Sequence, residues 1–392
     1  MIKKVILQTD TNEINKNKNH LISNVMSMEN KTCKKCILNE KIKGVQIAEN
    51  GLCNYCNKYK AFTPYGEDKL LRILKKAKKK KRIYDALVPL SGGKDSTYVL
   101  YLAVKKYKLN VLTYTFDNGF MSELAKRNIE KSVKESGVDH IWVKHDQQLI
   151  NEFYRTILLH SGEICGICGI GIKRSMLKLS EAWKIPVILM GHSPTESNSF
   201  TPEDIYDQNR IKAILRKNKN IKPAMLNRFL IYPNLNYIIS YLLTITGRFG
   251  KMVNILYYIN IPSDKEIGKI IKNAFAWEEP DQSDYTRHFD CIAEPFTNYI
   301  REKRFGYSRR LPQLCNMIRN NEISRDEALS IHTDDINKIL NDKFEYVLSE
   351  LHLTEKEMEE IGKIPLNVFS SNKSTANLIF ASIRHLIKGS NH

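Results

Sequence analysis

The stretch Ala86-Leu87-Val88-Pro89-Leu90-Ser91-Gly92-Gly93-Lys94-Asp95-Ser96 decides the fold of this 392-residue chain. Its apolar first half predicts a buried strand, and the amphipathic run from Thr97 to Tyr107 predicts a helix. Two adjacent glycines in the turn let the backbone approach a phosphate closely, because no Cβ stands in the way. The amides at the helix start then face the anion with the positive end of the helix dipole. The stretch therefore predicts a phosphate-binding turn between a strand and a helix.

The side chains of this turn suit a nucleotide that carries a metal ion. Lys94 supplies a mobile cation, Ser91 and Ser96 supply hydroxyl donors, and Asp95 fits a magnesium ligand. The spacing differs from the GxxxxGK[ST] loop of kinases and GTPases. It resembles the SGGxDS loop of the PP-loop ATP pyrophosphatases, which grips the β,γ-pyrophosphate while ATP is cleaved at the α-phosphate. The resemblance implies ATP and Mg²⁺ as cofactors, Lys94 and Asp95 as catalytic residues, and an ATP loop made of Ser91, Gly92, Gly93, Lys94, Asp95 and Ser96.

Strands and helices alternate from Ala86 onward, which predicts an α/β fold with a doubly wound parallel sheet, the PP-loop or HUP-like architecture. The predicted strands are Ala86–Leu90, Val111–Phe116, His140–Val143 and Pro186–Met190. The predicted helices are Asp68–Lys81, Ser96–Tyr107, Ser122–Ser136, Leu149–His160 and Cys168–Trp183. The alternation stops after about Ile205, and residues 205–275 are predicted to be helical.

Ligands of open parallel sheets bind beyond the carboxyl ends of the strands. Besides Ser91–Ser96, two predicted loops lie there: Asp117-Asn118-Gly119 and Gly191-His192-Ser193, with Glu196 close behind. Asp117 also fits a plain turn former, and His192 fits a helix cap or an ordinary loop histidine. Because all three loops follow strands of one sheet, we predict that Asp117, Gly191 and His192 belong to the ATP site.

Four of the eight cysteines form two knuckles, Cys33-x-x-Cys36 and Cys53-x-x-Cys56, separated by 16 residues. Each knuckle lets two thiolates converge on one ion, and the spacer is long enough for a β-hairpin to bring the knuckles together. Tetrahedral coordination by four thiolates suits zinc, and such closed sites are structural. The spacing predicts a small zinc-ribbon-like module near the N-terminus.

Cys165 and Cys168 form a third CxxC pair, with no fourth pair beside it. Three interpretations stay open: a second metal or iron–sulfur site, a redox or persulfide pair, and two buried structural thiols. Cys291 and Cys315 are the remaining cysteines that could join the pair. A helix N-terminus and nearby basic residues would lower the pKa of a thiol here and favour reactivity.

The composition, with 42% hydrophobic and 27% charged residues, is that of a soluble globular protein. The net charge of +18, concentrated in 75–82 and 210–222, fits either a polyanionic partner or a well-solvated basic surface. No signal peptide is recognisable, and no cysteine pattern suggests secreted disulfides. The uncharged run Phe229–Gly247 is diluted by Pro233 and polar residues, so we interpret it as a buried or interfacial helix pair, with peripheral membrane contact as the open alternative. These features predict a cytoplasmic protein with no transmembrane segment.

The chain divides into five predicted parts. A loosely ordered extension (1–30) precedes the four-cysteine module (31–62), and the PP-loop α/β domain (63–204) follows it. A helical substrate or partner region (205–345) and a helical tail (346–392) complete the chain. Within the helical region, Ser324 and Glu327 predict a capping box at the start of a helix.

Taken together, residues 31–335 resemble the N-acetyl sugar amidotransferases, a PP-loop branch that makes bacterial surface sugars such as those of lipopolysaccharide. The resemblance depends on Cys33-Lys34-Lys35-Cys36-Ile37-Leu38 with Asn50-Gly51-Leu52-Cys53-Asn54-Tyr55-Cys56, on SGGKDS, and on the block Arg304–Ala328. It implies adenylation of an amide carbonyl of a nucleotide-linked sugar, followed by attack of ammonia. Arg304, Arg309 and Arg310 are the predicted ligands of the sugar diphosphate, although they also fit a solvated basic helix. Ile2 leaves no N-terminal cysteine glutaminase in this chain, so a separate glutaminase subunit is expected as partner.

An alternative comes from the tRNA-thiolating PP-loop enzymes, which the stretch Cys165–Arg174 and Gly191-His192 also resemble. In those relatives the CxxC and a distant cysteine hold a cluster or carry sulfur, and an acidic pair follows the Gly-His. Here Thr195 and Glu196 stand at that place. The alternative implies thiolation of tRNA or of a small molecule, with nucleic acid as a partner in the first case.

Overall fold

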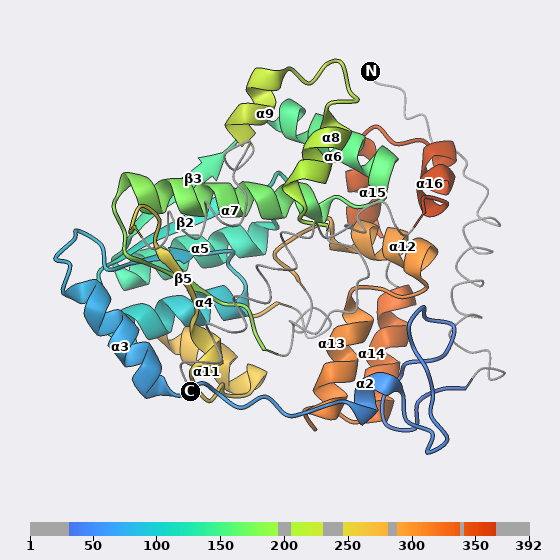
Figure 1. Ribbon diagram of the computed structural model, residues 1–392, viewed down its shortest axis with the longest axis horizontal. Helices are drawn as coiled ribbons and strands as arrows, with labels where there is room; N and C mark the ends of the chain where they lie inside the picture. Colours follow the sequence, from blue (N-terminus) through green and yellow to red (C-terminus); the bar gives the residue numbers. More distant parts are fainter. Residues whose placement is uncertain (1–30, 195–204, 230–245, 281–287, 338–340, 366–392) are drawn as a thin grey trace.

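The structure is a computed structural model that describes residues 31–194, 205–229, 246–280, 288–337 and 341–365 (Figure 1). The predicted extension at 1–30, Glu196, most of the run Phe229–Gly247 and the last part of the predicted tail lie outside these residues. Within the described parts of the chain, no helix is long and apolar enough to cross a membrane.

The centre of the fold is a five-stranded sheet in the order β3-β2-β1-β4-β5, and every neighbouring pair is parallel. Its strands are β1 (Ala86–Pro89), β2 (Val111–Asp117), β3 (Asp139–Lys144), β4 (Val187–Met190) and β5 (Lys251–Asn254). The chain builds outward from β1 to β3 and then returns to the other side of β1. The carboxyl ends of β1 and β4 therefore flank the point where the strand order reverses, which is where open sheets of this type bind ligands.

Both faces of the sheet are buried, so its strands are apolar on successive residues. Leu87, Leu112 and Ile188 pack toward the core that contains α6 (Gln147–Ser161) and α7 (Cys165–Ala182). Their neighbours on the same strands pack into the opposite core, and that core is formed by α3 (Glu67–Lys78), α4 (Lys94–Tyr101), α5 (Glu123–Ser136) and α11 (Asp264–Phe275). The predicted doubly wound α/β sheet is confirmed.

The four predicted strands are all present, and each predicted helix between them is found within a few residues of its expected bounds. The last turn of the helix after the glycine loop is a π-helical segment, η1 (Leu102–Lys106). The prediction of helix over the whole of 205–275 is wrong at β5. Only Val253 of this short strand is buried, so the sequence shows no apolar run there, and pairing with β4 forms the strand.

The remaining elements are mostly helices that follow the sheet. They are α8 (Gln208–Leu215), α9 (Pro223–Phe229), η2 (Ile255–Tyr257), α12 (Glu294–Phe305), α13 (Arg310–Arg319), α14 (Arg325–Asn337), α15 (Asp342–Glu350) and α16 (Glu355–Gly362). The predicted capping box is confirmed, because the Ser324 N–H donates to Glu327 Oε2 at 2.8 Å and the Glu327 N–H donates to Ser324 Oγ at 3.1 Å.

The four-cysteine module lies against the C-terminal helices rather than against the sheet. Its short helix α2 (Asn54–Asn57) lies beside α13 and α14 in Figure 1. Ile37, Leu38 and Ile42 of the module share one buried cluster with Leu311 and Leu314 of α13. The four-cysteine module and α13 thus share a hydrophobic cluster of their own, apart from the two clusters of the α/β core.

Candidate functional site

The glycine loop has the backbone geometry that its sequence demands. Gly92 has φ +80°, and a Cβ placed on it would lie 2.2 Å from the carbonyl oxygen of Ala125 in α5. Only glycine combines this left-handed conformation with so close an approach. Gly93 has an ordinary φ of −73° and forms the N-cap of α4. The loop therefore delivers the free N–H groups of a helix start to the carboxyl edge of the sheet.

The two serines of the loop hold it closed. Ser91 Oγ and Ser96 Oγ lie 3.1 Å apart, and the N–H of Ser91 donates to Ser96 Oγ at 3.2 Å. Ser96 Oγ in turn donates to the carbonyl oxygen of Gly93 at 3.0 Å. The hydroxyls that were predicted to bind phosphate therefore pair with the loop itself in this structure.

Lys94 is largely buried and lies between two carboxylates. Its Nζ is 2.9 Å from Asp95 Oδ1, and it also pairs with Asp264 at the start of α11. Although burial lowers the pKa of Lys94, the two carboxylates together raise it above its usual value. The cation is thus already neutralised within the protein, and a bound phosphate would have to compete with Asp264 for it.

The other two predicted loops do follow strands next to β1. Gly191, after β4, packs against α4: a Cβ there would lie 3.2 Å from the Asp95 carbonyl oxygen and 3.2 Å from Val99 Cγ2. Asp117, at the end of β2, accepts from the N–H of Gly119 at 3.0 Å and lies 3.5 Å from Lys144 Nζ. His192 is exposed. Their contribution to an ATP site stays a prediction.

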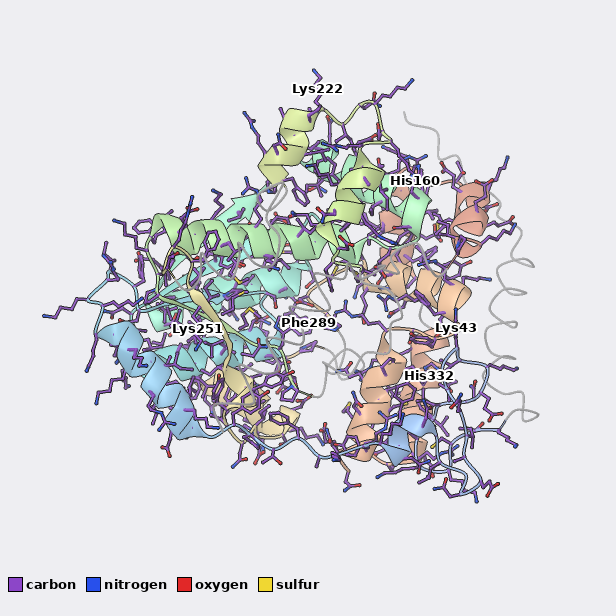
Figure 2. The ribbon with its side chains drawn as sticks, in the orientation of Figure 1. Lys43, His160, Lys222, Lys251, Phe289 and His332 are labelled. Atoms are coloured by element: carbon purple, nitrogen blue, oxygen red, sulfur yellow. The ribbon has the colours of Figure 1, made fainter. Side chains whose placement is uncertain are left out.

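The segment His288–Cys291, of which only Cys291 stood out from the sequence, lies against the glycine loop. It pairs with the chain after β2, since Ser122 N–H donates to the Asp290 carbonyl oxygen at 3.1 Å. A Cβ built on Gly93 would lie 3.6 Å from Asp290 Oδ2. Burial raises the pKa of the Asp290 carboxyl, opposed by a hydrogen bond with Ser91 and by the charge of Arg309. Figure 2 labels Phe289 near the middle of the molecule, between the sheet and the C-terminal helices.

The same segment brings Cys291 to the third CxxC pair. The amide nitrogen of Asn118 lies 3.6 Å from Cys168 Sγ and 3.9 Å from Cys291 Sγ. The expected low thiol pKa is wrong, because burial raises the pKa of Cys165, Cys168 and Cys291 to about 12 each. The positive charges of Arg309 and Arg301 lower the pKa of Cys165, as expected, but desolvation raises it by more.

The three predicted substrate arginines do not share one environment. Arg304 is buried and donates to the carbonyl oxygens of Gly162 and Pro365 at 3.3 and 3.2 Å. Arg310 is buried, with its Nε 3.6 Å from Asp335 Oδ2. Arg309 is exposed, and its guanidinium makes no hydrogen bond or ion pair with the described residues.

The positive charge of Arg309 affects the pKa values of residues around the glycine loop. Its positive charge is the first cause that lowers the pKa of His288, to about 3, and it also acts on Asp290 and Cys165. His288 is therefore a neutral imidazole at neutral pH. We call this polar region the central site. It consists of the glycine loop, Asp290, Arg309 and the three cysteines Cys165, Cys168 and Cys291.

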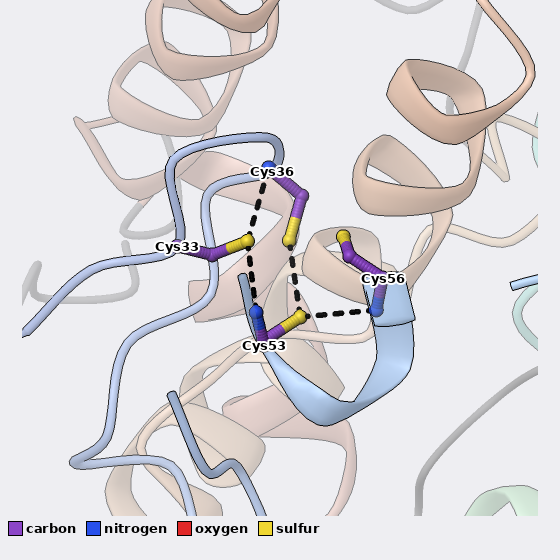
Figure 3. Close-up of side chains that lie close together, drawn as sticks. All are labelled: Cys33, Cys36, Cys53 and Cys56. Atoms are coloured by element: carbon purple, nitrogen blue, oxygen red, sulfur yellow. Dashed lines mark hydrogen bonds between the residues drawn. The ribbon is translucent and has the colours of Figure 1, made fainter. Parts of the chain in front are cut away.

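The four N-terminal cysteines form a second, separate centre (Figure 3). They are buried, and their sulfurs all lie within 4.8 Å of one another. Cys36 Sγ and Cys53 Sγ are 3.7 Å apart, and Zn–S bonds of about 2.3 Å in a tetrahedron place sulfurs at about 3.8 Å. The N–H groups of Cys36 and Cys53 donate to Cys33 Sγ at 3.5 and 3.2 Å. The donor set and its spacing fit a tetrahedral metal ion.

Cys291 and Cys315, either of which could have joined the Cys165/Cys168 pair on the sequence evidence, lie at different centres. Cys291 joins Cys168 at the central site, whereas Cys315 of α13 is buried against Cys36 and raises the pKa of that thiol. Sequence reasoning missed three residues that contact these two centres. Asp290 lies at the glycine loop, the indole N–H of Trp277 donates to the Gly92 carbonyl oxygen, and the Nε of Arg319 donates to Cys56 Sγ. Trp277 had a visible signal, as a lone tryptophan before Glu278-Glu279-Pro280, but nothing in the sequence placed it near residue 92.

Comparisons with solved structures return distant similarities. The U34-tRNA thiolase NcsA of Methanococcus maripaludis, solved with its [4Fe-4S] cluster, is 16% identical with a TM-score of 0.33, over 84% of this chain and 90% of that one. The NMN synthetase of Francisella tularensis is 11% identical with a TM-score of 0.36, over 71% of this chain and 93% of its own. The NH3-dependent NAD synthetase of Campylobacter jejuni is 15% identical with a TM-score of 0.27, over 56% and 94%.

Two sequence comparisons match part of the chain. A stretch of 164 residues, 41% of the chain, is 26% identical to the uncharacterized protein MJ1599 of Methanocaldococcus jannaschii and spans 58% of that protein. Residues 282–382 match the family described as LPS biosynthesis protein WbpG-like, C-terminal domain. The resemblance to the enzymes of bacterial surface-sugar synthesis is confirmed over this stretch, where the chain carries the sequence pattern of the WbpG-like LPS biosynthesis proteins.

Proposed function

We propose that this chain is an ATP-dependent amidotransferase that acts on the acetamido group of a nucleotide-linked N-acetyl sugar in lipopolysaccharide biosynthesis. The contact of Asp290 with Ser91 and Gly93 carries the proposal. Asp290 belongs to the part of the chain that matches the WbpG-like C-terminal domain, and the glycine loop is suited to a triphosphate. A sugar-biosynthesis domain and a nucleotide loop therefore share one site.

The chemistry explains why ATP is needed. The oxygen of an amide is a poor leaving group, so the carbonyl oxygen attacks the α-phosphorus of ATP and pyrophosphate leaves. Ammonia then attacks the activated carbon, loses a proton, and displaces AMP, which carries the original oxygen away. The product is an amidine. We propose that a separate glutaminase subunit supplies the ammonia. ATP and nucleotide sugars are cytoplasmic metabolites, so we place the reaction in the cytoplasm.

The residues of the central site divide the work. The amides at the start of α4 and the hydroxyls of Ser91 and Ser96 would bind the β,γ-pyrophosphate, and Lys94 would exchange Asp264 for a phosphate oxygen. Asp95 and Asp290 offer the hard carboxylate oxygens that Mg²⁺ prefers. That ion would neutralise negative charge on the leaving pyrophosphate.

Arg309 is the arginine that we assign to the diphosphate of the sugar nucleotide. Its guanidinium is exposed next to the central site, and guanidinium forks match phosphate oxygens. Arg304 and Arg310 lie close in sequence, but they contact the Gly162 carbonyl oxygen and Asp335, and we propose that they support α12 and α13 around the bound sugar.

A direct assay tests the proposal. The purified protein is supplied with ATP, Mg²⁺, ammonium and a panel of nucleotide-linked N-acetyl sugars, and AMP and pyrophosphate are measured. We expect release of both that depends on the sugar. Release of ADP, or no dependence on any sugar of a broad panel, would contradict the proposal.

The gathering of Cys168 and Cys291 around Asn118 favours a second candidate, a sulfur transferase that thiolates tRNA or a small molecule. Sulfide would then replace ammonia as the nucleophile, and an iron–sulfur cluster on Cys165, Cys168 and Cys291 would hold or carry the sulfur. Metal and sulfide analysis of anaerobically purified protein separates the two. About one zinc without iron favours the amidotransferase, whereas iron with acid-labile sulfide favours sulfur transfer.

A further inference from the structure

The four-cysteine centre would carry a negative charge with a divalent metal ion bound. Four thiolates around one divalent cation leave a net charge of −2, and all four cysteines are buried. A buried charge is costly unless a partner of opposite sign compensates it. The partner comes from the other end of the chain. Arg319, the last residue of α13, is itself buried, and its Nε donates to Cys56 Sγ at 3.3 Å.

Contacts with three side chains fix the orientation of this guanidinium: the Cys56 contact just described and two more. Its Nη2 lies 3.8 Å from Cys36 Sγ, so one planar group reaches a sulfur of each knuckle. Its Nη1 donates to Asn316 Oδ1 at 2.7 Å, one helical turn earlier in α13. A lysine could offer the same charge but could not span two sulfurs and an amide at once.

Helix α13 connects this contact with the central site. It runs from Arg310 to Arg319, a length of about 15 Å, and Arg309 is its N-cap residue. The backbone N–H of Arg309 donates to Asn298 Oδ1 of α12 at 3.2 Å. One end of a single helix thus contacts the metal thiolates, and the other end carries the exposed arginine.

We propose that Arg319 is a positioning residue that couples the four-thiolate metal centre to α13, so that the metal holds Arg309 in place at the central site. The hydrogen bonds of Arg319 spread negative charge off the sulfurs of Cys36 and Cys56 and slow the loss of the metal. The importance of Arg309 for the sugar substrate rests on the proposed function, whereas the coupling itself does not.

Arg325 offers a matched control. It also reaches the four-cysteine module from a C-terminal helix, but its Nε donates to the carbonyl oxygen of Cys36, at 3.3 Å, and not to a sulfur. The variants to compare are Arg319→Met, Arg319→Lys and Arg325→Met. All three remove or change a cationic side chain at the same interface.

The first experiment measures the metal. Zn²⁺-loaded full-length proteins are mixed with a chromogenic chelator, and Co²⁺-loaded samples are scanned for the sulfur-to-cobalt charge-transfer band. We expect Arg319→Met to release Zn²⁺ about 10- to 100-fold faster than the wild type, with a shifted cobalt band. The rate of Zn²⁺ release from Arg319→Lys should lie between those of the wild type and Arg319→Met. The rate from Arg325→Met should stay within about threefold of the wild-type rate. Equal release from Arg319→Met and Arg325→Met overturns the proposal.

The second experiment measures the coupling by hydrogen exchange at saturating Zn²⁺. We expect faster exchange along α13, including its first turn next to Arg309, in Arg319→Met but not in Arg325→Met, and unchanged exchange in α4. Unchanged α13 exchange in a zinc-loaded Arg319→Met overturns the coupling. If Arg319→Met does not fold, Arg319→Lys decides: release or exchange equal to that of Arg325→Met overturns the proposal. None of these readouts needs ATP or sugar, so a failed amidotransferase assay leaves them valid.

Discussion

The indole N–H of Trp277 donates a 3.0 Å hydrogen bond to the carbonyl oxygen of Gly92. Trp277 is almost fully buried, lies just after α11, and packs edge-on against Phe289 with ring centroids 6.0 Å apart. A residue 185 positions away thus supports the middle of the glycine loop and, through Phe289, the segment that carries Asp290.

Replacing Trp277 by Phe should keep much of the packing and remove the hydrogen bond to Gly92. We expect a loss of about 1 kcal/mol or more in the free energy of unfolding, because the Gly92 carbonyl loses its donor and the smaller ring leaves space. ATP affinity, measured by calorimetry, should fall several-fold. Trp183→Phe is the control, since Trp183 is 41% exposed and packs edge-on against Tyr84, with ring centroids 5.5 Å apart. Equal ATP affinity in both variants would show that Trp277 does not support the loop.

The two glycines of the loop should respond differently to alanine. Gly92→Ala forces a Cβ into a left-handed residue and against the Ala125 carbonyl oxygen, so the protein should lose more than about 1 kcal/mol of stability. Gly93 has an ordinary φ, and a Cβ there would lie 3.3 Å from Ser91 Oγ, which a small shift of that side chain relieves, so Gly93→Ala should lose less stability than Gly92→Ala. The new methyl group should nevertheless obstruct phosphate at the helix start. Urea denaturation and ATP titration of both variants check this, and a Gly93→Ala protein with normal ATP affinity contradicts it.

Lys94 and Asp95 should separate binding from chemistry. Lys94→Ala should weaken ATP binding, because the lysine charge acts on the phosphates before and during the reaction. Asp95→Asn should leave ATP affinity within about tenfold, about 1.4 kcal/mol, while turnover falls about a hundredfold or more, since Asp95 acts on the charge that builds on pyrophosphate. Calorimetry and a coupled pyrophosphate assay measure the two effects. Near-normal turnover of Asp95→Asn would refute the role of the loop in ATP cleavage.

Asp264→Asn is the control for the lysine. Asp264 pairs with Lys94 from the side of α11, so the Asn variant should leave Lys94 paired with Asp95 alone and ATP affinity equal or higher. A marked loss of ATP affinity in this variant would mean that the Asp264 carboxylate itself takes part in binding.

The central-site cysteines should react slowly at neutral pH. Their pKa values of about 12 keep them protonated at pH 7, and below its pKa a thiol gains about tenfold in thiolate fraction for each pH unit. Alkylation of Cys165 by iodoacetamide, followed by mass spectrometry of the peptide, should therefore accelerate about tenfold per unit from pH 7 to pH 10. A rate that levels off near pH 9, as an ordinary thiol's does, would contradict the raised pKa.

Local sequence patterns were sufficient for the alternating part of the fold. The strands around β1 are apolar on both faces, the glycine pair dictates the turn, and Ser324 with Glu327 dictates a helix start. Each of these depends on residues a few positions apart, so the sequence shows them directly. The spacing of the two cysteine knuckles predicted their convergence for the same reason.

Strand β5 could not be predicted in this way. It has four residues with one buried side chain, and its pairing with β4 is what makes it a strand. The pKa values of the central-site thiols are raised, whereas the sequence predicted lowered values. Desolvation depends on every group that packs around a sulfur, and the sequence shows only the neighbouring charges.

The sequence by itself determined the doubly wound sheet, the glycine loop and the four-cysteine cluster, because hydrophobic period, glycine conformation and thiolate spacing are local properties. Only the tertiary structure decided that Asp290 and Trp277 lie at the loop, that Arg304 is buried while Arg309 is exposed, and that Arg319 contacts the clustered cysteine sulfurs. The contacts of Trp277 and Arg319 join residues 185 and 263 positions apart. The difference between Arg304 and Arg309 depends on which side of a helix packs inward. These relationships arise from the burial of whole faces against one another, which no short stretch of sequence encodes.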